Sequence, residues 1–159
     1  MTPTTAFVSS REDRYFEDYV PNTISEFGPL LVSQDEIINF ARKFDPQDMH
    51  IDPEAAARSP FGGLIASGWH TLSLMMRIFA DNYLSAVASL PSPGVDEVRW
   101  VKPVRPGDEL WLRTTTLETR RSQSKPDRGL VRTRLEALNQ NGELVASMVA
   151  MNFVVLRAP

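Results

Sequence analysis

Two residues of this sequence, Asp45 and His50, have the types and the spacing that general acid–base chemistry requires. They lie five positions apart in a segment that follows a helical pattern and contains Pro46, so the chain can bend back and bring both side chains to one pocket. A carboxylate beside an imidazole can hold one water molecule, because the more basic group removes a proton while the other supplies one. In a buried setting, their interaction would also move both pKa values toward a working pH.

The same pair also permits a purely structural interpretation, in which Asp45 caps a turn and His50 packs against the core. The spacing does not decide between the two interpretations, because an aspartate five positions before a histidine occurs by chance in many chains. The other histidine, His70, lies in an apolar helical stretch and is predicted to be a packing residue. The sequence has no cysteine for a thiol nucleophile or a thiolate zinc site, and we expect neither a metal nor a bound cofactor.

The composition is typical of one globular domain in water. The chain has 159 residues, of which 42% are apolar and 23% are charged. Its net charge of −3 gives no electrostatic attraction to nucleic acid or anionic lipid, so we expect neither partner. No apolar run reaches the ~20 residues of a membrane-spanning helix, and the N-terminus lacks the basic and apolar regions of a signal peptide. We therefore expect a cytoplasmic protein.

The residues around the pair are predicted to form two helices joined by a loop. Ser33 and Glu36 have the spacing of a capping box, and the helix that they open must end by Asp45 because a proline follows. A loop is expected over 45–51. Asp52 and the proline after it then mark the start of a short second helix.

A longer helix is predicted further along, because apolar residues recur at steps of three or four over about five turns. Neighbouring positions are apolar as well, which indicates a helix buried at the centre of the fold. The recurring residues are Trp69, Leu72, Met76, Phe79, Tyr83 and Val87.

After this helix the hydrophobic period changes to two, which predicts strands joined by hairpins. With one short apolar edge strand before the helices, the expected strands cover residues 27–32, 95–104, 109–119, 130–139 and 144–156.

This order of elements predicts an α+β fold, a single hot-dog domain in which one curled antiparallel sheet wraps around the long central helix. We expect the domain over 14–159, preceded by a flexible tail over 1–13. Such a sheet leaves an open edge, so two copies are expected to pair into one continuous sheet as a homodimer or a larger homo-oligomer.

The segment from Phe44 to Pro53 resembles the signature of the MaoC-like dehydratases, the (R)-specific enoyl-CoA hydratase group of hot-dog proteins. That signature has an aromatic residue, then Gly-Asp-x-Asn-Pro-x-His, and a helix start like Asp-Pro. The Gly-rich start of the long helix at 62–71 and the strand and turn at 98–108 also resemble this family. The resemblance extends in order over roughly 15–156.

The sequence departs from this signature at two places. Phe44 stands where the family has glycine, and Gln47-Asp48 stands where Asn-Pro is usual. The amide of Gln47 can still donate a hydrogen bond to a water molecule.

The resemblance implies the reversible addition of water to a trans-2-enoyl thioester of CoA or of an acyl carrier, giving the (R)-3-hydroxyacyl thioester. Asp45 and His50 would hold the water, with Gln47 orienting it; which of the pair is the base stays open. Backbone N–H groups near Ser67 and Gly68 would bind the thioester oxygen. This placement is physically sound, since free N–H groups and the positive end of a helix stabilise an enolate-like oxygen.

Two other functions remain possible from the sequence. One is an acyl-CoA thioesterase with a carboxylate as base or nucleophile, and the other is a non-catalytic acyl-CoA-binding subunit. Some side chains also allow two interpretations. An apolar set could line an acyl tunnel or belong to the core, and a basic set could contact CoA phosphates or be a solvated hairpin end. The apolar set consists of Trp69, Met75, Met76 and Phe79. The basic set consists of Arg120, Arg121, Lys125 and Arg128.

Overall fold

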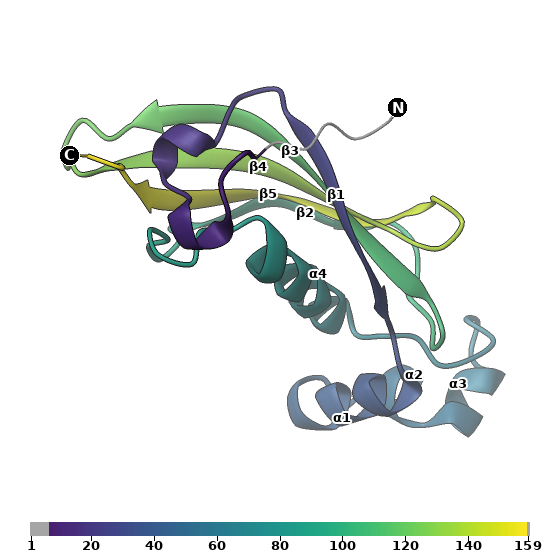
Figure 1. Cartoon of the computed structure of the whole chain (residues 1–159). Coiled ribbons are helices and arrows are strands. Elements are labelled where there is room, and N and C mark those ends of the chain that lie inside the picture. Colours follow the sequence, from purple (N-terminus) through teal and green to yellow (C-terminus); the bar gives the residue numbers. More distant parts are fainter. Residues whose placement is uncertain (1–6, 159) are drawn as a thin grey trace.

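A five-stranded antiparallel sheet curls around helix α4 (Gly68–Asn82) in the computed structural model, which describes residues 7–158 (Figure 1). The strand order is β1-β3-β4-β5-β2, so β1 and β2 form the two edges. The α+β arrangement predicted from the order of elements is confirmed. The strands are β1 (Ile24–Leu31), β2 (Gly94–Trp100), β3 (Glu109–Arg121), β4 (Arg128–Leu138) and β5 (Leu144–Val155).

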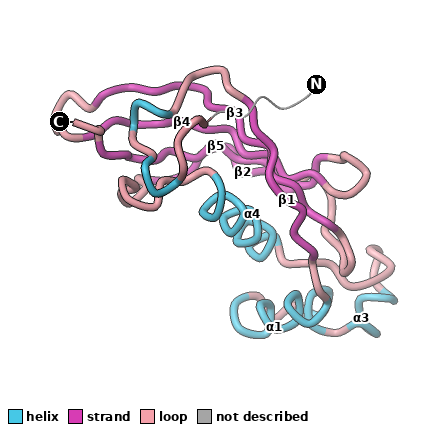
Figure 2. Tube along the Cα trace, in the orientation of Figure 1, coloured by secondary structure: helices cyan, strands magenta, loops and turns pink. Residues whose placement is uncertain are grey.

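The helices lie on one side of the sheet (Figure 2). Helix α4 packs against the sheet, and three shorter helices gather near its N-terminal end (Figure 1). No helix in the described part of the chain is long and apolar enough to cross a membrane. The helices are α1 (Gln34–Phe44), α2 (Asp48–Ile51), α3 (Pro53–Arg58) and α4 (Gly68–Asn82).

Helix α4 is central as predicted, but only part of the predicted stripe is buried: Phe79 and the C-cap Tyr83 are buried, whereas other members are exposed. Trp69 and Met76 are 61% and 46% exposed, and the helix ends at Asn82, so Val87 lies in the following loop. Because most sides of this helix are apolar, periodicity could not tell which side would face the sheet. The buried side consists of His70, Thr71, Leu74, Met75, Ile78 and Phe79.

The strands present alternate residues to the core, as their period of two predicts. On β3 the buried positions include Leu110 and Leu112, followed by two threonines. The hydroxyl of Tyr83 pairs with Thr116 Oγ1 (2.7 Å) and Thr133 Oγ1 (2.9 Å), so these polar side chains are buried without loss of hydrogen bonding.

Several boundaries differ from the sequence-based expectation. Strand β1 begins at Ile24 rather than at residue 27, and β2 ends at Trp100 rather than at 104. Beyond Trp100, the N–H groups of Val101 and Lys102 both donate to Val145 O, so the regular ladder stops there. A one-turn helix, α2, occupies part of the loop expected over 45–51.

The first part of the expected N-terminal tail, residues 1–6, lies outside the described residues. From Phe7 onward the chain packs on the domain: the Phe7 ring contacts Tyr19 and Tyr83 edge-on, with centroid distances of 5.2 and 5.3 Å. A 3-10 turn follows over Arg11–Asp13, where Arg11 Nε donates to Leu84 O (2.9 Å). Contacts with the domain therefore begin before residue 14, the boundary expected from the sequence.

Candidate active site

The end of α1 and the single turn of α2 bring the predicted pair together. Helix α1 starts at the N-cap Ser33, as expected, and ends before Asp45, whose N–H still donates to Ala41 O. Pro46 then turns the chain away from the helix. His50 lies in the turn that follows, and its Nε2 is 3.4 Å from Asp45 Oδ2. Both side chains therefore reach one site, as the spacing predicted.

The setting of His50 determines which ring nitrogen is free. The side chain is buried, and Nδ1 lies 2.7 Å from the carbonyl oxygen of Ile65. A carbonyl can only accept a hydrogen bond, so Nδ1 carries the hydrogen. In the neutral ring, Nε2 then has a free lone pair on the side of Asp45. The separation of 3.4 Å exceeds a normal hydrogen bond, although apo catalytic contacts are often long.

Asp45 is held by two donors, one on each carboxylate oxygen. Gln47 Nε2 donates to Oδ1 (2.6 Å), and Ser67 Oγ donates to Oδ2 (2.7 Å). These hydrogen bonds, first from Gln47 and then from Ser67, lower the pKa of Asp45 below its ordinary value; the charge of His50 acts in the same direction, and burial opposes it. Asp45 is therefore a carboxylate near neutral pH. The amide of Gln47 is bound to Asp45, where the sequence predicted it to orient water.

Ser67 and Gly68 lie where the sequence placed them, at the start of α4. Ser67 is the N-cap, and its Oγ also accepts a hydrogen bond from Trp69 N–H (3.3 Å). The N–H of Gly68 has no acceptor among residues 7–158, and Gly68 lines a cavity. The positive end of a fifteen-residue helix, with an N–H that makes no hydrogen bond to the described residues, therefore lies at this cavity. The contact between the Ser67 hydroxyl and Asp45 was missed in the sequence, which gave no sign of it.

A tryptophan that the sequence analysis did not single out covers Gly68. Trp100, at the end of β2, donates from Nε1 to Gly68 O (2.8 Å). A Cβ atom at position 68 would lie only 2.5 Å from the indole ring, so glycine is required for this packing. Trp69 meets Trp100 edge-on, with ring centroids 5.6 Å apart.

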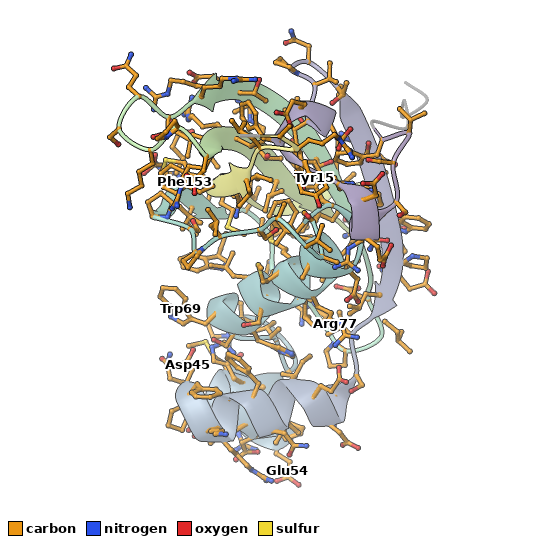
Figure 3. All side chains as sticks on the ribbon, turned by 60° about the vertical axis from the view of Figure 1, so that its left-hand side comes forward. Tyr15, Asp45, Glu54, Trp69, Arg77 and Phe153 are labelled. Carbon is orange, nitrogen blue, oxygen red and sulfur yellow. The ribbon has the colours of Figure 1, made fainter. Side chains whose placement is uncertain are left out.

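These residues surround a cavity of about 450 Å³ between the start of α4, α2 and the segment after β2. Asp45 and Trp69 mark the place where the short helices face α4 (Figure 3). Most of the wall is apolar, and the polar groups in it are few. The wall includes Met49, Phe61, Ile65 and Val104, with Lys102 as its cation. A small number of polar groups in an apolar cavity is typical of a small-molecule site.

The other candidates lie away from this cavity or only border it. His70 is buried and stacks on Phe40, with ring centroids 4.8 Å apart, and burial lowers the pKa of its imidazole, so it packs as predicted. Of the four apolar residues considered for an acyl tunnel, only Trp69 lines the cavity. Met75 and Phe79 belong to the core, and Met76 is exposed.

The basic hairpin between β3 and β4 lies at the opposite end of the sheet. On β5, Val155 pairs with Arg128, whereas Trp100 pairs with the distant Ala146. Arg128 is bound by its neighbour Asp127 (2.8 Å). Within one chain, this hairpin therefore does not reach the cavity. In the part of the chain that the structure describes, no group of three or more potential ligands is placed to hold a metal ion.

A family model described as the MaoC-like domain matches residues 11–140. The chain is 34% identical over 141 residues to the mesaconyl-CoA hydratase of Cereibacter sphaeroides, a match that covers 86% of this chain and 39% of that relative. It is 37% identical over 83 residues to the 3-hydroxyacyl-thioester dehydratase Z of Mycobacterium tuberculosis, covering 51% of this chain and 55% of that protein. The chain thus spans less than two thirds of the length of either relative.

Among solved structures, the MaoC-like dehydratase from Rhodospirillum rubrum is similar along nearly the whole chain. The TM-score is 0.82 at 41% sequence identity, and the match covers 92% of this chain and 99% of that one. The likeness therefore extends over most of the domain.

Proposed function

The chain belongs to the MaoC-like domain family, and on that premise we propose that it adds water reversibly to a trans-2-enoyl thioester, giving the (R)-3-hydroxyacyl thioester. One observation carries the proposal: an ionised Asp45 and a His50 with a free Nε2 meet at 3.4 Å beside a largely apolar cavity. The hydratase and the dehydratase among its relatives support chemistry of this kind. The acyl group would be carried by CoA or by an acyl-carrier protein.

The geometry suggests how the proton moves. A water molecule donates one hydrogen bond to Asp45 Oδ2 and another to His50 Nε2. As its oxygen bonds to C3 of the substrate, Nε2 takes the proton, and the electrons of the C2=C3 bond move toward the thioester oxygen. The N–H of Gly68 stabilises the negative charge there. C2 then takes a proton back from Nε2, so His50 is both base and acid while Asp45 stays ionised.

The test is hydration of crotonyl-CoA and of longer enoyl-CoA esters, followed by the loss of ultraviolet absorbance of the conjugated enoyl group. Asp45→Asn and His50→Ala should each lower kcat by about 10²- to 10⁴-fold, the usual contribution of a positioned acid or base. Asp48→Asn is the matched control, because it makes the same chemical change at an exposed position three residues away. Full activity in both site variants would disprove the assignment.

The same assay separates the other candidate functions. A thioesterase would release free CoA, which a thiol reagent detects while the enoyl bond persists. A non-catalytic acyl-CoA-binding subunit would bind the esters and leave all of them unchanged. We favour hydration because the family comparison and the Asp45–His50 geometry both support it.

We also propose that two copies pair through their β2 edges. Most residues of β2 are exposed, and Val95 and Trp100 on this edge strand are about half exposed. The exposed side of α4, with Trp69 and Met76, carries large apolar side chains as well. An open strand edge and exposed apolar residues are the features that a second copy would cover.

A further inference from the structure

Ser67 connects the catalytic carboxylate to the helix that would bind the thioester oxygen. Its side chain is fully buried, and its Oγ donates to Asp45 Oδ2 (2.7 Å) while accepting from Trp69 N–H (3.3 Å). Its backbone oxygen accepts from Thr71 N–H (3.0 Å). One residue therefore joins the end of α1 to the first turn of α4, although Asp45 and Ser67 are 22 positions apart.

The carboxylate oxygen that Ser67 binds, Asp45 Oδ2, is the one that would accept a hydrogen bond from the reacting water molecule. Oδ2 of Asp45 faces His50 Nε2, whereas Oδ1 is bound by Gln47 on the opposite side. A carboxylate can rotate about its Cβ–Cγ bond, and two donors on its two oxygens fix that rotation. With Ser67 on one lone pair of Oδ2, another remains free to accept from water.

We propose that Ser67 is a positioning residue of the hydration reaction, whose hydroxyl holds Asp45 Oδ2 at the place where a water molecule reaches His50 Nε2. The inference rests on the proposed function. It gives the side chain of Ser67 a role that differs from the role of its backbone at the helix start. Loss of the hydroxyl would leave the substrate cavity intact and disturb the water, so kcat should fall more than KM rises.

The hydroxyl also favours the ionised form of Asp45, because a donated hydrogen bond stabilises the carboxylate. Its removal should therefore raise the pKa of Asp45, and the acid limb of the kcat/KM profile should move to higher pH. His50 on α2 is the titratable group whose charge acts on the pKa of this carboxylate. Lys102 lines the same cavity, and Asp48 on α2 and Arg42 and Lys43 in the last turn of α1 are exposed. Lys102 Nζ is bound to Glu143 (2.6 Å).

Ser67 is also a helix N-cap, so a loss of stability must be separated from a loss of positioning. Ser67→Gly removes the hydroxyl but places a residue that is tolerated at N-caps. Ser67→Ala removes the hydroxyl and also places a residue that is unfavourable at N-caps. Ser67→Thr keeps a hydroxyl. Ser33→Ala is the matched control, because Ser33 caps α1 through Glu36 N–H (3.1 Å) and does not contact Asp45.

The experiment measures kcat and KM against pH with crotonyl-CoA for the full-length protein and these four variants, after circular dichroism has shown which are folded. Ser67→Gly and Ser67→Ala should lose about tenfold or more in kcat and show an acid limb at higher pH. Ser67→Thr should recover most of the rate, and Ser33→Ala should match the wild type. Wild-type kcat and an unmoved acid limb in Ser67→Gly would overturn the proposal.

A second measurement does not depend on activity. The chemical shift of the Asp45 carboxyl carbon is followed by NMR as a function of pH in the wild type and in Ser67→Gly. The pH midpoint of this titration, which reports the pKa of Asp45, should be higher in the variant. If no enoyl-CoA is hydrated by the wild type, the proposed function fails, whatever the midpoint does. If the wild type is active and the midpoint does not move, the role of Ser67 fails and the proposed function stands.

Discussion

Hydrogen bonds fix the orientation of both Asp45 and His50, and each side chain keeps a lone pair that can accept a hydrogen bond from water. The carbonyl of Ile65 fixes the proton of His50 on Nδ1, and Ser67 with Gln47 keeps Asp45 ionised. Nε2 of His50, with its free lone pair, then faces Asp45 Oδ2, which keeps a second lone pair beside the one that accepts from Ser67. In the proposed reaction, this arrangement lets His50 carry the proton while Asp45 stays charged.

At the residue scale, Gly68 and Trp100 give a test based on steric fit. Gly68→Ala places a methyl group 2.5 Å from the Trp100 indole and must displace it. We expect about a tenfold or greater loss in kcat/KM. In a Trp100→Ala background the same methyl group meets no ring, so Gly68→Ala should cost little more.

The control is a double-mutant cycle, in which kcat/KM is measured under one condition for the wild type, Gly68→Ala, Trp100→Ala and the double variant. If Gly68→Ala were equally damaging with and without Trp100, the cause would lie in the backbone N–H of Gly68 instead of in the ring.

At the element scale, the two ends of α4 make different contacts. Its N-terminus supplies Ser67 and Gly68 to the site, and its C-terminus is bound by a buried arginine. Arg14 Nη1 donates to the carbonyls of Asn82 (2.8 Å) and Tyr83 (2.9 Å), and burial lowers the pKa of this guanidinium. A cation at the negative end of a helix stabilises both the orphan carbonyls and the helix dipole.

Arg14→Met should therefore destabilise the fold, because it leaves the Asn82 carbonyl without its donor and removes one of the two donors to the buried Tyr83 carbonyl, which also accepts from the Tyr19 hydroxyl (3.0 Å). We expect a loss of about 1–3 kcal/mol in the free energy of unfolding, measured by urea denaturation. Arg77→Met is the control on the same helix, since its ion pair with Asp81 is exposed and contributes about 0.5 kcal/mol or less. Equal losses in the two variants would contradict the capping role.

At the scale of the whole molecule, the two sheet edges differ. The β1 edge contains Gly28 and Pro29, and a proline has no N–H to offer another strand. The β2 edge has no proline and is largely exposed, and it adjoins the exposed apolar side of α4 through the contact between Trp100 and Trp69. Pairing of two copies through β2 would extend the sheet and cover Trp100, which also borders the cavity.

Val95→Glu should weaken this pairing, because it places a charge on the β2 edge of both copies. The molar mass from light scattering should fall from that of a dimer toward that of one chain. Val87→Glu is the control, since Val87 is exposed in the loop after α4 and does not belong to β2. A wild-type protein that is monomeric at every tested concentration would refute the dimer.

Much of the fold was predictable because its signals are local. The cap at Ser33, the proline after Asp45 and the alternation along β3 act within a few residues, so their helix and strand were identified from the sequence. The Asp45–His50 pair was also found in this way, since both residues lie in one short segment. The one-turn helix α2 was missed because four residues carry too little periodicity.

The sequence by itself determined most of the elements, their order and the segment that carries Asp45 and His50. Tertiary packing decided which side of α4 is buried, and it brought Ile65 O, Ser67 Oγ and Trp100 to the site. These contacts join residues that are 15 to 32 positions apart. Local propensity does not specify such distant partners. They come into contact because α4 packs against both the sheet and the short helices, which places these residues side by side.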